Sequence, residues 1–398
     1  MSWEKKTLDQ LGSISRGKSK HRPRNDPKLF GGQYPFIQTA DVKNANFYIT
    51  EYSDTYNEAG LAQSKLWDVG TLCITIAANI ADTGILGIPA CFPDSVMGFI
   101  PYDGISDVRF IKYCFDLLQR DCKQISQGTA QDNLSWQKLS TIEFPAPPIE
   151  TQHRIANILS AYDNLIENNR KQIKLLEEAA QRLYKEWFVD LRFPGHERTK
   201  IVDGMPEGWR NIQLSDVSAI NANSISKDYP FDYIDYIDLS SVQNGIIKET
   251  TWYSLADAPG RAKRIANDGD VIWGMVRPNL KSFALVLNPK ETDVFSTGFC
   301  VLSPKFVPFS YLYYAVTTEN FIAYLINCTN GAAYPAVKPI HFAEANLLCP
   351  DNCLLDRFNA IVEPMLRKRE KLLIMIKWAQ QARNRLLPKL MNGEMEVK

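Results

Sequence analysis

The feature that most constrains the fold is an internal repeat, in which the second half of the 398-residue chain follows the frame of the first. Four apolar positions open each half with one spacing, so that Trp3, Leu8, Leu11 and Ile14 recur as Trp209, Leu214, Val217 and Ile220. Further along, GTLCITIA at 70–77 corresponds to GDVIWGMV at 269–276, and the segment 128–147 corresponds to 331–350. Such a repeat predicts two copies of one structural unit.

Each half ends in a long helical pattern, with apolar positions alternately three and four residues apart as in a coiled-coil seam. The seam positions that we expect are Ile155, Ile158, Tyr162, Leu165, Asn169, Leu176 and Leu183 in the first helix, and Phe358, Ile361, Met365, Leu372, Ala379 and Leu386 in the second. The alternative is two amphipathic helices, each packed on its own domain. Asn169 either fixes the register of the seam or points to water.

The parts between these helices mix strand and helix patterns. FDYIDYIDL at 231–239 and DVIWGMV at 270–276 predict short strands, whereas YLYYAVTTENFIAYLIN at 311–327 predicts helix. The fold class that we expect is α+β.

The formal net charge is zero, which argues against a protein that coats nucleic acid by bulk charge. Basic residues are nevertheless concentrated at 16–24, RGKSKHRPR, where no acidic residue intervenes. This segment could contact phosphates.

The sequence lacks the motifs of several other classes of protein. It contains no GxxxxGK[ST] phosphate loop, no GxGxxG fingerprint and no GxSxG elbow, so we expect no cofactor and no catalytic activity. The most closely spaced cysteines, Cys349 and Cys353, have no second pair or nearby histidine, so we expect no metal site. No run approaches the roughly 18 apolar residues of a membrane span, so we expect a cytoplasmic protein.

Several stretches resemble the specificity subunits of type I restriction-modification systems, in the order and two-fold arrangement typical of that family. They are GGQYPFIQTADV at 31–42, GTLCITIAANIADTGIL at 70–86, QGTAQDNLSWQKLSTIEFPAPPIETQHRIANILSAYDNLI at 127–166 and RLLPKLMNGE at 385–394. The resemblance covers the full chain.

The resemblance implies two globular target-recognition domains in tandem repeat, separated by two long antiparallel coiled-coil helices. The implied boundaries are 1–150 for the first recognition domain, 151–192 for the central spacer helix, 193–350 for the second recognition domain and 351–398 for the C-terminal spacer helix. Family members read a bipartite site in double-stranded DNA, one half per domain. Methyltransferase subunits and restriction-translocation subunits bind them and carry the chemistry that uses S-adenosylmethionine and ATP.

Within that framework we expect side chains in the DNA grooves to read bases and basic residues to contact phosphates. In the first domain the expected phosphate contacts are Arg16, Lys18, Lys20, Arg22 and Arg24, and the expected base or sugar contacts are Gln38, Thr39, Asn79, Gln131 and Asn133. In the second domain the candidates are Asn223, Lys227, Ser240, Ser241, Arg261, Lys263, Arg264, Arg277, Asn279, Lys281 and Tyr334. For any one of them the alternative is a solvated loop side chain.

A helix over 151–189 would be about 60 Å long at roughly 1.5 Å per residue, somewhat less than two turns of B-DNA at about 34 Å each. The helices would then act as a ruler between half-sites. The alternative function is a two-domain DNA-binding protein outside restriction, such as a recombination or anti-restriction factor. A hydrolase would require metal ligands that the sequence does not supply.

Overall fold

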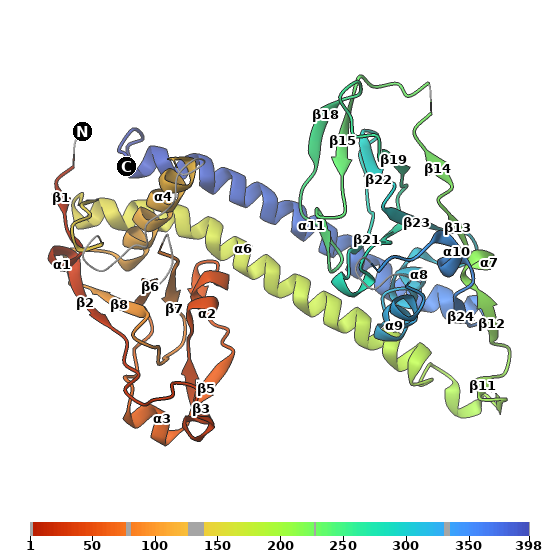
Figure 1. Cartoon of the computed structure of the whole chain (residues 1–398), viewed down its shortest axis with the longest axis horizontal. Coiled ribbons are helices and arrows are strands. Elements are labelled where there is room, and N and C mark those ends of the chain that lie inside the picture. Colours follow the sequence, from red (N-terminus) through yellow and green to blue (C-terminus); the bar gives the residue numbers. More distant parts are fainter. Residues whose placement is uncertain (1–2, 77–80, 126–138, 227, 330–334, 398) are drawn as a thin grey trace. The chain divides into compact units, whose positions relative to one another are not determined.

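The computed structural model describes residues 3–76, 81–125, 139–226, 228–329 and 335–397. The chain forms two compact units: unit 1 contains Met1–Lys171 and Ile374–Lys398, and unit 2 contains Gln172–Leu373. The division falls inside the two long helices, so each helix contributes one part to each unit (Figure 1).

Unit 1 is built on a five-stranded sheet with strand order β2-β8-β6-β7-β4, in which only β4 and β7 pair in parallel. Its strands are β1 (Lys5–Lys6), β2 (Gly12–Arg16), β3 (Phe30–Phe36), β4 (Tyr48–Ile49), β5 (Asp54–Tyr56), β6 (Leu72–Thr75), β7 (Thr83–Leu86), β8 (Val96–Pro101) and β9 (Phe144–Pro145). Its shorter helices are α1 (Leu8–Leu11), α2 (Thr39–Asn44), α3 (Glu58–Ala62) and α4 (Val108–Ile125). The central strands β6 and β7 are buried along their whole length.

Unit 2 contains a four-stranded sheet, β13-β23-β20-β21, and a five-stranded sheet, β14-β19-β22-β15-β18. Its strands are β10 (Ile201–Val202), β11 (Met205–Pro206), β12 (Arg210–Gln213), β13 (Ser218–Ile220), β14 (Asn223–Ser224), β15 (Tyr233–Ile237), β16 (Val242–Gln243), β17 (Ile246–Ile247), β18 (Thr251–Ser254), β19 (Ala262–Ile265), β20 (Val271–Gly274), β21 (Phe283–Leu285), β22 (Asp293–Ser296), β23 (Phe299–Pro304) and β24 (Asn346–Cys349). Its shorter helices are α7 (Leu214–Val217), α8 (Phe309–Ala315), α9 (Glu319–Asn327) and α10 (Pro339–Ala343). The α+β prediction is confirmed.

The sequence repeat is a structural repeat. The order β13-β23-β20-β21 in unit 2 reproduces β2-β8-β6-β7 in unit 1, and the pair β12-β24 reproduces β1-β9. The short helices α1 and α7 occupy equivalent places and begin in the same way: the backbone N–H of Thr7 donates to Gln10, and that of Gln213 donates to Asp216. A side chain three residues into the helix therefore satisfies a free backbone donor in both copies.

The two long helices are α6 (Ile149–Tyr184), which continues into a π-helical turn at Lys185–Val189, and α11 (Asn352–Met391). Their first residues, 149 and 352, differ by the displacement of 203 seen in the sequence. They run antiparallel within each unit. In unit 1 Asp163 pairs with Arg383 and Arg154 with the carbonyl of Val397, and in unit 2 Tyr184 packs against Phe358.

The buried line on each helix lies one residue further along than the seam we expected. On α6 it passes through Ala156, Leu159, Asp163, Ile166 and Ile173. On α11 it passes through Val362, Leu366, Arg369, Ile376 and Leu387. Charged residues occupy some of these positions, so the apolar pattern alone favoured the neighbouring line.

The expected seam residues consequently divide into three groups. Ile155, Asn169, Phe358, Leu372 and Ala379 are buried, and Tyr162, Leu176, Leu183, Met365 and Leu386 are partly exposed. Ile158, Leu165 and Ile361 are 39%, 38% and 42% exposed, so they are not seam positions. The Asn169 side chain is buried rather than solvated, and its Nδ2 has no hydrogen-bond partner among the described residues.

Candidate nucleic-acid interface

The basic segment 16–24 leaves the end of β2 and forms an exposed loop of unit 1 (Figure 1). Arg24 pairs with Asp94 at 2.6 Å and Arg22 lies 3.9 Å from the same carboxylate, so part of the charge of both is neutralised. The remaining three residues form what we call the basic triple: Arg16, Lys18 and Lys20. All three are exposed, and no ion pair within the described ranges involves them. Their charge is therefore available to an anion.

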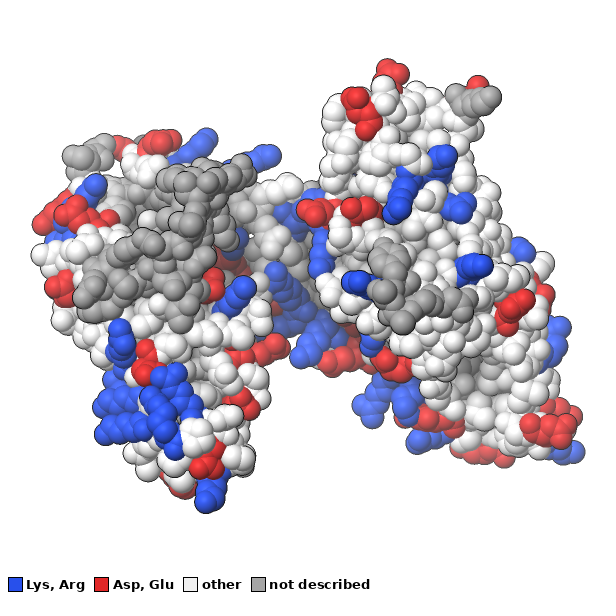
Figure 2. Space-filling view, viewed as in Figure 1, with Lys and Arg blue, Asp and Glu red and all other residues white. Residues whose placement is uncertain are grey.

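Basic side chains are dense on this part of the surface, and Figure 2 shows Lys and Arg grouped on unit 1 where Figure 1 draws the loop after β2. Asp26, the first acid after the basic segment, is held by local contacts. The backbone N–H of Lys28 donates to Asp26, and His21 lies 2.9 Å from it; both contacts lower the pKa of Asp26. His21 thus serves to orient the loop.

Beside the loop lies a cavity of about 410 Å³, lined by Ser19, Arg24, Asn25, Pro27, Phe30, Phe36, Gln38, Thr39, Asp54, Pro93 and Ser95. The structure therefore brings together Arg24, Gln38 and Thr39, which the sequence proposed as separate contacts. Gln38 is held at the start of α2: its backbone N–H donates to Asp41 and its Nε2 donates to Asp54 at 2.5 Å.

Two further residues at this cavity were missed by sequence reasoning. Ser19 is buried, and its hydroxyl has no hydrogen-bond partner among the described residues. Asp54 lies at the start of β5 and accepts from Gln38. Ser19 lies among the basic residues of segment 16–24, which drew attention to charge alone. Asp54 belongs to no motif or periodic pattern in the sequence.

In unit 2 the connection between β20 and β21 is a strained turn. Arg277 and Lys281 both have left-handed backbones, with φ of 48° and 55°, on either side of the short 3-10 turn Pro278–Leu280. Residues other than glycine adopt this conformation at a cost of about 1–3 kcal/mol each, and such strain is concentrated at functional sites. The turn exposes Arg277 and Asn279, and Lys281 pairs with Glu319 at 2.6 Å.

The other candidates of unit 2 lie in two further places. Ser240 and Ser241 donate to Asp238, and although burial opposes it, these hydrogen bonds lower the pKa of that carboxyl. The β16–β17 hairpin, which follows these serines, is joined to the β20–β21 connection, because the backbone N–H of Asn244 donates to the carbonyl of Lys281. Asn223 lies on β14, which pairs with β19. Lys263 and Arg264 lie on β19, and Arg261 directly precedes it.

Asn79, Gln131, Asn133, Lys227 and Tyr334 lie outside the described residues. Among the described residues no cluster of three or more His, Cys, Asp or Glu side chains could hold a metal ion. No helix in the described ranges is long and apolar enough to cross a membrane.

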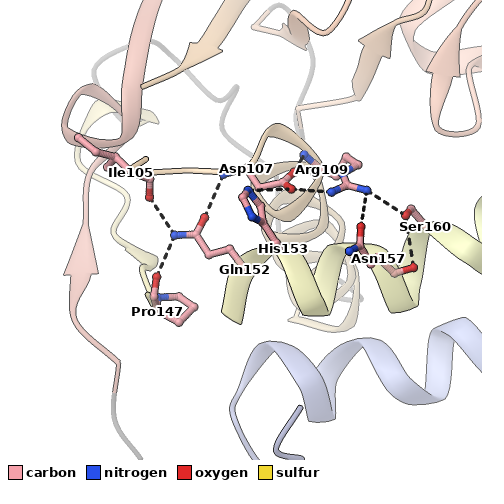
Figure 3. A network of polar contacts seen from close by, with 8 residues as sticks. All are labelled: Ile105, Asp107, Arg109, Pro147, Gln152, His153, Asn157 and Ser160. Carbon is pink, nitrogen blue, oxygen red and sulfur yellow. Dashed lines mark hydrogen bonds and ion pairs between the residues drawn. The ribbon is translucent and has the colours of Figure 1, made fainter. Parts of the chain in front are cut away.

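The part of unit 1 that precedes α6 is joined to that helix by a buried polar network (Figure 3). The fully buried Gln152, in the first turn of α6, accepts from the backbone N–H of Asp107 at 3.1 Å. Its Nε2 donates to the carbonyls of Ile105 at 3.0 Å and Pro147 at 2.9 Å. One amide thereby ties the start of α6 to the residues that lead into α4.

Arg109 extends this network along α6. Its guanidinium donates to both carboxylate oxygens of Asp107, at 3.2 and 2.7 Å, and to Asn157 at 2.9 Å. The hydrogen bonds with Asp107 raise the pKa of Arg109. His153 lies at the rim, 3.8 Å from Asp107 and half exposed.

Two features are common to the two parts of the molecule: each half of the chain repeats one sheet and ends on a long helix, and polar or basic loops are exposed on both units. Comparison with known proteins shows what the chain is similar to. Residues 1–178 match the family described as type I restriction modification DNA specificity domain. Over nearly its whole length the chain is similar to proteins named type I restriction enzyme specificity subunits.

Relatives align along nearly the whole chain. The MjaIX type I specificity subunit of Methanocaldococcus jannaschii is 24% identical over 99% of this chain and 94% of its own length. The MjaVIII specificity subunit of the same organism is 23% identical over 92% of this chain and 87% of its own length. A crystal structure of the type I S subunit from M. genitalium covers 100% of this chain and 97% of its own, with a TM-score of 0.64 at 16% identity. This last likeness concerns the fold.

Proposed function

We propose that this chain is the DNA-reading subunit of a type I restriction-modification complex, and that each unit reads one half of a bipartite site. The observation that carries the proposal is the contrast between a repeated frame and divergent loops. The loop after β2 reads RGKSKHRPR, whereas the residues at the equivalent place after β13 read ANSISKDYP at 222–230. A constant frame with different exposed side chains suits two different half-sites.

In this proposal the basic triple contacts phosphates and sets position, while the cavity lined by Gln38 and Thr39 faces a base edge or sugar. An amide can donate to and accept from an adenine edge, and hydroxyls can serve either role. In unit 2 the strained turn at Arg277–Lys281 presents the corresponding side chains. A rigid turn is suited to this role because it loses little conformational freedom on binding.

Methyl transfer and DNA cleavage are assigned to partner subunits, the methyltransferase and the restriction-translocation subunits. The chain itself then needs no cofactor and acts as a non-catalytic subunit in the cytoplasm. We further propose that α6 and α11 set the number of unread base pairs between the half-sites. At roughly 1.5 Å per residue the 36 residues of α6 extend over about 54 Å.

Binding selection from a random double-stranded DNA library tests the proposal, with the purified chain and its methyltransferase subunit as bait. The expected result is two short specified sequences separated by a spacer of fixed length and free composition. Replacing Gln38 and Thr39 with alanine should relax one half-site and leave the other unchanged. Enrichment of one continuous sequence, or relaxation of both half-sites together, would overturn the proposal.

A further inference from the structure

In each unit an ion pair joins α6 to α11, and the acid lies on α6 in both. In unit 1 the guanidinium of Arg383 donates to Asp163, whose other carboxylate oxygen accepts from the hydroxyl of Tyr113 at 2.5 Å. In unit 2 the guanidinium of Arg369 donates to Glu177 and, at 2.7 Å, to the carbonyl of Gly245.

One member of each pair is deeply buried. The side chain of Asp163 is 3% exposed, and that of Arg369 is 4% exposed. Burial raises the pKa of Asp163, and Arg383 opposes that shift by favouring the charged form. The N-terminal half of the chain thus contributes a buried acid to the helix pair, and the C-terminal half contributes a buried base.

The sequence repeat shows which residues would lie opposite Asp163 and Arg369 if one half of the chain paired with a second copy of the same half. The displacement of 203 between α6 and α11 makes Ala180 the equivalent of Arg383, and Gln380 the equivalent of Glu177. Asp163 would face Ala180 in a pair of N-terminal halves. Arg369 would face Gln380 in a pair of C-terminal halves, so both buried charges would lose their partners.

We infer that Asp163 and Arg369 make each half of this chain select the opposite half as its helix partner and exclude a second copy of itself. The apolar frame does not discriminate, because both halves carry it. A buried charge without its partner disfavours an assembly by at least about a hundredfold. A half from a related chain would be accepted only if it supplied the opposite charge at these positions. The inference is independent of DNA reading.

The experiment uses the folded full chain, with a specific protease site placed in the exposed turn at 198–200 and cut after purification. Cleaved protein is mixed with an isotopically labelled copy and warmed until labelled and unlabelled halves exchange. Native mass spectrometry then counts the pairs. We expect pairs of opposite halves, with like pairs below about one in a hundred.

A matched variant removes both ion pairs by giving each residue the identity found at its repeat-equivalent position. The changes are Asp163→Leu, Arg383→Ala, Glu177→Gln and Arg369→Ile. Like pairs should then rise toward the statistical share of one half of all pairs. Like pairs in the unaltered protein, or their absence from a folded variant, would overturn the inference. If this variant does not fold, a smaller one with only Glu177→Gln and Arg369→Ile takes its place, and like pairs of the C-terminal half should rise in it. Their absence from that folded variant would overturn the inference.

Discussion

Replacing Gln152 with leucine should loosen the junction between α6 and the residues that lead into α4. Leucine preserves most of the side-chain volume, and the repeat places a buried leucine, Leu355, at the equivalent position of α11. The substitution therefore tests hydrogen bonding rather than shape. It removes three hydrogen bonds and leaves one backbone N–H and two carbonyls without their side-chain partner.

The expected cost follows from the surroundings of those three groups. A buried polar group left without a partner costs about 1–3 kcal/mol. Ile105 lines a surface cavity of about 690 Å³ and its hydrogen bond to Gln152 is partly exposed, so water can reach its carbonyl and reduce the loss. The N–H of Asp107 and the carbonyl of Pro147 have no such access, because their hydrogen bonds to Gln152 are buried. We therefore expect a local destabilisation of about 2–4 kcal/mol.

Hydrogen exchange of the intact chain measures this effect, because it reports local opening free energies. Amides at the start of α4 and α6 should exchange roughly 30-fold to 1,000-fold faster, at about 1.4 kcal/mol per tenfold change. Peptides of unit 2 serve as an internal reference. Asn157→Ala is the matched control, since it removes one exposed hydrogen bond of the same network and should change exchange by about threefold or less. Equal effects of the two substitutions would refute the reasoning.

Three further changes to the chain test the phosphate contacts, the spacer helices and the packing of unit 2. Replacing the basic triple with alanine should weaken binding to specific and non-specific DNA alike and flatten its salt dependence; a collapse of specific binding alone would instead make these residues base readers. Inserting one heptad after Asn169 and another after Leu372 should lengthen the unread spacer by about three base pairs, and an active variant with the original spacer would contradict the ruler. Gly245→Ala should destabilise unit 2 by about 2–3 kcal/mol in urea unfolding, because φ is +80° and a Cβ would lie 2.6 Å from the Tyr313 hydroxyl. In Gly260→Ala the new Cβ would meet no atom within 4 Å, so the free energy of unfolding should barely change. Equal losses of stability in the two variants would exclude strain at Gly245 as the cause.

The repeat and the long helices could be predicted because each is encoded by the spacing of many apolar residues. The apolar spacing around Leu8 recurs around Leu214, and the structure has an equivalent short helix at both places. The helix seam was displaced by one residue because its deepest positions include charges, Asp163 and Arg369, which local patterns place on the solvent side. Their burial depends on partners about 200 residues away in sequence.

The candidate site was predictable only in part, for a related reason. A run of basic residues identifies an exposed loop, but Asp94, which neutralises Arg22 and Arg24, is distant in sequence. The cavity beside the loop is lined by residues from four separate segments, so no local sequence pattern predicts that Ser19 or Asp54 belongs to it. The left-handed backbones of Arg277 and Lys281 are likewise imposed by the turn and not by residue type.

Methylation mapping decides whether each unit reads its own half-site. The chain, expressed with its methyltransferase subunit in a host that lacks other methylation, is compared with a variant whose unit 2 turn carries Arg277→Ala and Asn279→Ala. Single-molecule sequencing then reads the methylated sites of the whole genome. The account predicts a bipartite site in which the variant relaxes one half and keeps the other half and the spacer. Methylation at a continuous site, or a variant that alters both halves equally, would contradict it.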